Sequence, residues 1–136
     1  MKYSYTKIPP NNPQEKWSAR PLLNICIVGP KDKVNVTALI DSGADCSLFN
    51  EELALEIGLK LQGTRKKFFG IGNQGLDATM TKVKIKPDGF NEIEIEAGFV
   101  EKGAPFAAIL GQKDFFDNFR IKFMKDVDTI EITTVA

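Results

Sequence analysis

The clearest chemical signal in the sequence is Asp41-Ser42-Gly43-Ala44, which directly follows the apolar run Ala38-Leu39-Ile40. A strand ending at Ile40 would deliver the Asp41 carboxylate into a tight turn, where Gly43 permits unusual backbone angles and close approach of other groups. A carboxylate positioned in this way suits general acid–base chemistry. The same three residues also form ordinary Asx-turns at strand ends, so the motif alone leaves a catalytic and a structural role open.

Composition narrows the chemistry that Asp41 could take part in. The 136 residues include no histidine, which excludes Ser-His-Asp and Cys-His catalysis and most zinc enzymes. Eighteen basic residues balance eighteen acidic ones, so no nucleic-acid or membrane partner is indicated. Cys26 and Cys46 are too few for a disulfide scaffold and lack metal-ligand spacing. We therefore expect reduced thiols, a cytoplasmic protein, and neither metal nor cofactor.

The chain length predicts a single domain. We expect residues 1–20 to form an extended arm, partly ordered at best, because Pro9, Pro10 and Pro13 remove backbone donors there. Alternatively, Trp17 anchors the arm to the body. Residues 21–136 then make the folded domain. No apolar segment resembles a signal peptide or a membrane span.

The elements that must position Asp41 are mostly strands. Apolar and alternating patterns predict a hairpin of strands 22–28 and 34–40, and strands 61–69 and 76–86 around a glycine-rich turn. A short helix should begin after the N-cap Asn50 and end at Gly58. A second short helix is expected over Lys113–Asn118, with strands near 120–123 and 129–135. The sequence therefore predicts a mostly β fold with two short helices.

One hairpin can be placed in register. Lys82, Lys84 and Lys86 alternate with apolar residues, and so do Glu92, Glu94 and Glu96. A loop over Pro87–Asn91 would set each lysine opposite a glutamate, which stabilises a strand pair by a few tenths of a kcal/mol, roughly.

Three segments together resemble the retropepsin-like aspartic proteases. Asp41–Asn50, read as DSGADCSLFN, is similar to the active-site loop of that family. Ile109-Leu110-Gly111 is similar to its late hydrophobic-hydrophobic-glycine element, and Phe69-Gly70-Ile71-Gly72 to the tip of its flap. The stretch ILGQKDFFDNFRIKF looks most like the prokaryotic single-domain members. The resemblance covers about residues 21–123.

The resemblance implies a closed, mostly β half-barrel that acts as a homodimeric endopeptidase on peptide or protein substrates. Asp41 would be catalytic, and Ser42, Gly43 and Ala44 would support the active-site loop. Because Asp41 is the only aspartate followed by a hydroxyl residue and glycine, the second carboxylate of the dyad would come from a partner chain. Ile109, Leu110 and Gly111 would be structural. The family needs neither metal nor cofactor.

The resemblance also implies substrate-binding residues. Gly70, Ile71 and Gly72 would form a flap over the cleft. Asp45 is either a residue that holds substrate backbone or an ordinary turn carboxylate. Gln112 stands where retroviral members often carry an arginine that braces the acidic residue, so that brace should be missing or neutral.

Other interpretations compete with this one. Residues 70–75 satisfy GxGxxG, but the strand pattern that follows argues against a dinucleotide site. Cys46 is either a redox-sensitive thiol near the cleft or a small buried hydrophobe. The chief alternative is a retropepsin-like dimer that binds peptides without cleaving them.

Overall fold

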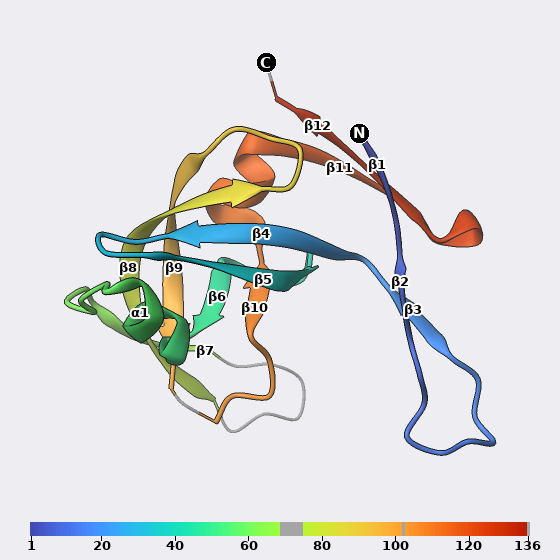
Figure 1. Ribbon diagram of the computed structural model, residues 1–136, viewed down its shortest axis with the longest axis horizontal. Helices are drawn as coiled ribbons and strands as arrows, with labels where there is room; N and C mark the ends of the chain where they lie inside the picture. Colours follow the sequence, from blue (N-terminus) through green and yellow to red (C-terminus); the bar gives the residue numbers. More distant parts are fainter. Residues whose placement is uncertain (69–74, 102, 136) are drawn as a thin grey trace.

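Strands dominate the computed structural model, which describes residues 1–68, 75–101 and 103–135 (Figure 1). The strands are β1 (Lys2–Ser4), β2 (Thr6–Ile8), β3 (Ser18–Arg20), β4 (Leu22–Val28), β5 (Lys33–Ile40), β6 (Ser47–Asn50), β7 (Arg65–Phe68), β8 (Leu76–Pro87), β9 (Ile93–Val100), β10 (Ala108–Leu110), β11 (Phe119–Met124) and β12 (Thr129–Thr134). The helices are α1 (Glu51–Ile57) and the short turns η1 (Gln112–Phe116) and η2 (Lys125–Val127).

Six of the strands close into a barrel. The hydrogen-bonded order is β4-β5-β10-β6-β9-β8, and the second half of β8 returns to pair with β4. The first half of β8 pairs with β7 along the edge opposite β9, the same edge along which its second half pairs with β4. The predicted mostly β half-barrel is therefore confirmed.

Local signals in the sequence placed the first hairpin and the helix correctly. β4 and β5 pair antiparallel from Leu22–Leu39 to Val28–Lys33. Helix α1 begins after Asn50, whose Oδ1 accepts a hydrogen bond from Glu52 N at 3.1 Å. It ends at Gly58, whose φ of 71° lies in the left-handed region that glycine tolerates best.

The predicted lysine–glutamate register is confirmed for two of its three pairs. β8 and β9 set Lys82 opposite Glu96 and Lys84 opposite Glu94. The third pair falls outside the ladder, because β9 begins only at Ile93. Glu96 forms its ion pair with Lys113 of the η1 turn, at 2.8 Å.

The barrel interior holds the main core. Its central aromatic pair is Phe49 on β6 and Phe99 on β9, whose ring centroids lie 5.7 Å apart in an edge-to-face arrangement. Helix α1 adds Ala54 and Ile57 to this core. A second, smaller cluster of buried residues consists of Cys46, Leu48, Ala78 and Val100.

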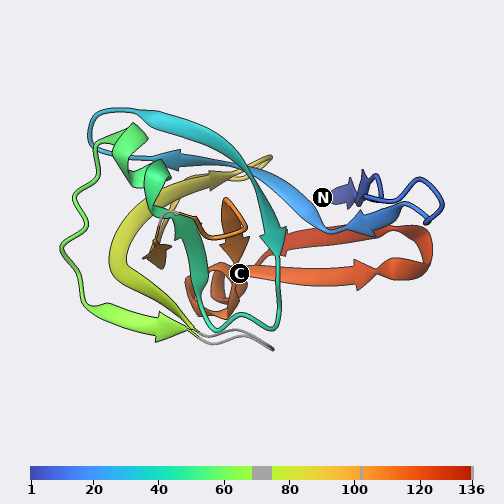
Figure 2. The same cartoon turned by 90° about the horizontal axis from the view of Figure 1, so that it is seen from below.

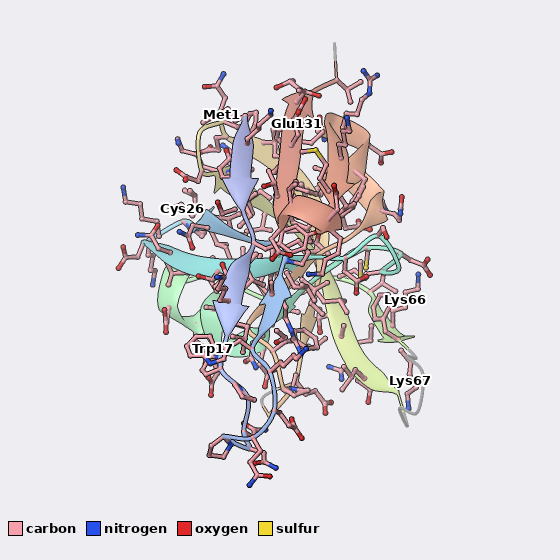
Figure 3. All side chains as sticks on the ribbon, turned by 90° about the vertical axis from the view of Figure 1, so that its right-hand side faces the viewer. Met1, Trp17, Cys26, Lys66, Lys67 and Glu131 are labelled. Carbon is pink, nitrogen blue, oxygen red and sulfur yellow. The ribbon has the colours of Figure 1, made fainter. Side chains whose placement is uncertain are left out.

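The N-terminal segment is more structured than its prolines suggested. β1 pairs antiparallel with β12, so that Lys2 lies opposite Glu131, and β2 pairs with β3. Figure 2 shows these strands and the β11–β12 hairpin on the same side of the barrel. Trp17 is no anchor, because 63% of its surface is exposed beside the arm (Figure 3). Long-range strand pairing, not tryptophan burial, attaches this segment.

The second short helix also differs from the prediction. The η1 turn starts at Gln112, and Lys113 and Asp114 have non-helical backbone angles within it. Asp114 has a φ of 67°, and its Oδ2 accepts a hydrogen bond from Glu96 N at 2.7 Å. The turn is therefore shaped by a contact to β9 that sequence periodicity does not reveal.

Replacing Tyr3 by alanine tests the attachment of β1. Tyr3 is half-buried against the main core, so Tyr3→Ala should lower the free energy of unfolding by about 2 kcal/mol in urea titrations. Trp17→Ala is the matched control, since it removes a larger but exposed ring and should change stability by less than about 0.5 kcal/mol. Equal, negligible effects would show that the arm is not packed on the body.

Candidate active site

Asp41 lies at the point where β5 leaves the barrel. Its backbone N–H donates to the Leu110 carbonyl at 2.9 Å, which continues the β5–β10 ladder by one residue. Its Oδ1 accepts a hydrogen bond from Gly43 N at 2.9 Å, and its carbonyl accepts from Ala44 N at 3.2 Å. The carboxylate is half-buried and held by the turn that follows it.

The Ile109-Leu110-Gly111 element lies directly beside this loop. β10 is inserted between β5, which it pairs with in parallel, and β6, which it pairs with antiparallel. Leu110 is opposite Ile40, and Ile109 is opposite Leu48. A strand between β5 and β6 therefore fixes both ends of the loop over residues 41–46.

Position 111 has no room for a side chain. A Cβ atom at this position would lie 2.3 Å from the Cys46 carbonyl oxygen and 2.8 Å from that of Ala44. Both neighbours are backbone atoms, which cannot swing aside as a side chain could. Gly111 N donates instead to the buried Ser47 Oγ at 3.1 Å. The glycine thus lets β10 approach the active-site loop closely.

Gln112 provides a neutral brace for the loop. Its backbone N–H donates to the Ala44 carbonyl at 2.8 Å, and its side-chain Nε2 donates to the Ser42 carbonyl at 2.6 Å. Lys113 N continues the pattern by donating to the Asp45 carbonyl at 2.9 Å. The loop backbone is held by these donors, while the Ser42 and Asp45 side chains remain exposed.

A pocket of about 230 Å³ opens beside Asp41, and we call it the catalytic pocket. Its lining residues are Asp41, Gly43, Ala44, Asp45, Cys46, Leu48, Phe68, Leu76, Phe106 and Ile109. The predicted flap residues Gly70, Ile71 and Gly72 lie outside the described residues. Phe68, the last residue of β7, pairs with Leu76, the first residue of β8, and both line the pocket.

Several groups of the pocket could not be identified from the sequence. Leu48, Leu76 and Phe106 come from three separate segments, and only the fold brings them together. Ser47 belongs to the loop sequence DSGADCSLFN, but its bond to Gly111 joins residues 64 positions apart. The position of Leu48 within DSGADCSLFN was the one signal that could have marked it.

Burial and charge set the ionisation of the groups around the pocket. Cys46 is buried, and loss of solvation raises the pKa of its thiol, which favours the small-hydrophobe interpretation. The hydrogen bond and positive charge of Lys113 lower the pKa of the Glu96 carboxyl. In the described part of the chain, no three Cys, Asp or Glu side chains are grouped closely enough to hold a metal ion.

The sequence was compared with known protein families. The family model for aspartyl proteases matches residues 25–113, which run from β4 to the η1 turn and include every element around the catalytic pocket. The chain belongs to the aspartyl protease family. The resemblance to retropepsin-like enzymes is confirmed by this match and by the closed barrel. No curated protein matches the sequence at a significant level.

The two cysteines of this aspartyl protease domain, Cys26 and Cys46, are both free thiols. Among the described residues, none of the helices has the length and apolar character needed to cross a bilayer.

Substituting Gly111 tests the steric constraint at the loop. Gly111→Ala should lower the free energy of unfolding by about 3 kcal/mol in denaturant titrations, because the added methyl group meets backbone oxygens. Gly103→Ala is the control: Gly103 has a φ of 101°, but an added Cβ atom would meet nothing within 4 Å, so this change should cost about 1 kcal/mol. A smaller loss at Gly111 than at Gly103 would contradict the close approach.

Titrating Glu96 by NMR tests its ion pair with Lys113. Lys113→Gln should raise the Glu96 pKa toward its ordinary value near 4.5, whereas Lys84→Gln should leave it unchanged. Because the folded-state pKa is lowered, the stabilisation is present above the unfolded value and is lost as the pH falls through the folded one. An unchanged pKa in Lys113→Gln would show that the pair does not form in solution.

Proposed function

We propose that this chain is an aspartic endopeptidase that works as a homodimer, with one Asp41 from each chain in a shared dyad. The observation that carries the proposal is the position of Asp41, at the mouth of a largely apolar pocket and in a loop held by backbone hydrogen bonds. The only Asp-Ser-Gly sequence of the chain lies there, so a second such carboxylate has to come from a second chain.

The dyad would use ordinary acid–base chemistry. Two carboxylates a few ångström apart cannot both ionise easily, so they share one proton. One carboxylate removes a proton from a water molecule, which attacks the peptide carbonyl carbon. The protonated carboxyl donates a hydrogen bond to the carbonyl oxygen, on which negative charge develops. The proton taken from the water then passes to the leaving amine as the C–N bond breaks. The dyad again holds one shared proton.

The neighbouring loop residues fit supporting roles in this dimer. The Ser42 side chain is exposed next to Asp41, so its hydroxyl is free to bridge to the partner's loop. Asp45 is exposed at the pocket wall, where its carboxylate is placed to accept hydrogen bonds from substrate backbone. We assign the enzyme to the prokaryotic single-domain type and to the cytoplasm, where its two free thiols stay reduced.

Replacing Asp41 tests the chemistry. Asp41→Asn should abolish cleavage of denatured proteins between pH 4 and 7, roughly, because an amide cannot act as the base. Asp126→Asn, an exposed carboxylate in η2, should leave cleavage unchanged. Mass spectrometry of the products and thermal melts of both variants check activity and folding. Residual cleavage by folded Asp41→Asn would mean that another group performs the reaction.

Diluting the enzyme tests the shared dyad. Specific activity should fall as the protein is diluted through the dimer dissociation constant, because one chain carries half of the site. Sedimentation velocity at the same concentrations should show the change from dimer to monomer. Cleavage by a strict monomer would contradict the shared dyad, and a dimer that binds peptides without cutting them would favour the non-catalytic module.

A further inference from the structure

A second groove adjoins the catalytic pocket. It has a volume of about 400 Å³ and is lined by Asp45, Cys46, Gly63, Thr64, Lys66, Met80, Glu96 and Lys113. Asp45 and Cys46 line both spaces, so the two share a wall. A peptide lying across Asp41 would therefore reach the second groove a few residues from the bond that is cut.

Strand β7 turns one face toward both spaces. Side chains alternate along a strand, so Lys66 and Phe68 lie on one face and Arg65 and Lys67 on the other. Phe68 lines the catalytic pocket and Lys66 lines the second groove. The Lys66 ammonium lies 5.3 Å from the centroid of the Phe68 ring. This contact links the wall of the second groove to the wall of the catalytic pocket.

Of the three cations on β7, Lys66 is the one without an ion pair among the described residues. Arg65 is ion-paired with Glu101 at 3.2 Å, and Lys67 with Asp77 at 3.6 Å. Figure 3 shows Lys66 and Lys67 at the same edge of the molecule. Within residues 1–68, 75–101 and 103–135, no carboxylate lies within ion-pair distance of the exposed Lys66 side chain.

The lining of the groove carries two ammonium groups, Lys66 and Lys113, and two carboxylates, Asp45 and Glu96. Lys113 and Glu96 neutralise one another through their 2.8 Å ion pair. The charges of Lys66 and Lys82 also help to lower the pKa of the Glu96 carboxyl. Asp45 lines both the catalytic pocket and the second groove. Lys66 lines the second groove but not the catalytic pocket.

We propose that the second groove is a specificity subsite in which Lys66 binds an acidic side chain of the substrate. The inference rests on the proposed function, because it assigns the class of peptide that the site prefers: one with Glu or Asp a few residues from the scissile bond. The carboxylate meets an ammonium group that has no competing ion pair among the described residues, and Asp45 and Cys46, which line both spaces, place the groove next to the pocket that holds Asp41.

Positional peptide pools, in which Glu, Gln or Lys is fixed at one position in turn, test the subsite. The wild-type enzyme should cut the Glu pool about fivefold faster than the Gln pool, in kcat/KM, at one position only. Lys66→Met should abolish that preference, Lys66→Glu should shift it to the Lys pool, and Lys66→Arg should retain it. Lys67→Met, on the opposite face of β7, should behave as the wild type.

The outcomes separate this inference from the proposed function. Cleavage without a preference for Glu, or with a preference that survives in Lys66→Met, overturns the subsite and leaves the protease intact. If the wild type cuts nothing, the proposed function fails, and the subsite is decided by fluorescence anisotropy of the labelled pools. Tighter binding of the Glu pool that disappears in Lys66→Met supports the subsite, and equal binding of the Glu and Gln pools overturns it.

Discussion

The close contact between β10 and the loop over residues 41–46 is the constraint on which the site depends. Three backbone hydrogen bonds cross this contact, from Asp41 to Leu110, from Gln112 to Ala44 and from Lys113 to Asp45. They form only if Gly111 comes against the Cys46 carbonyl, where there is no room for a side chain. The loop is therefore positioned by main-chain groups, while the Ser42 and Asp45 side chains remain exposed.

The surroundings of the loop divide into an apolar and a charged part. The apolar side chains of Leu48, Phe68, Phe106 and Ile109 line the pocket that also holds Asp41. The charged part lies beyond the shared wall, where Lys113 is already neutralised by Glu96. The alternation of β7 connects these parts, because one strand supplies an aromatic ring to the first and an ammonium to the second.

The two ends of the chain stabilise a separate layer beside the barrel. β12 lies between β1 and β11, so both of its edges are paired within one chain. The N-terminal ammonium of Met1 donates to the Ile132 carbonyl at 2.6 Å, and Ile132 N donates to the Met1 carbonyl at 2.8 Å. Over Thr129–Glu131, both edges of β12 therefore have backbone partners within this chain.

Interactions between residues close in sequence were sufficient to predict much of this structure. The Asn50 and Gly58 caps, the β4–β5 hairpin and the Lys82–Glu96 register follow from side-chain capping, turn chemistry and period-two alternation between residues close in sequence. The resemblance of DSGADCSLFN and Ile109-Leu110-Gly111 to one family identified the fold correctly. Those signals also marked Asp41 as the candidate catalytic residue.

Tertiary structure alone decided the rest, because the deciding contacts join residues far apart in the chain. Nothing in Lys2-Tyr3-Ser4 indicates a partner strand at Thr129–Glu131, and the turn of Asp114 depends on a bond to β9. The steric need for Gly111 exists only when β10 enters between β5 and β6. Likewise, Lys66 is one of eighteen basic residues in the sequence, and only the fold places it in the groove beside Asp45 while its neighbours on β7 are ion-paired.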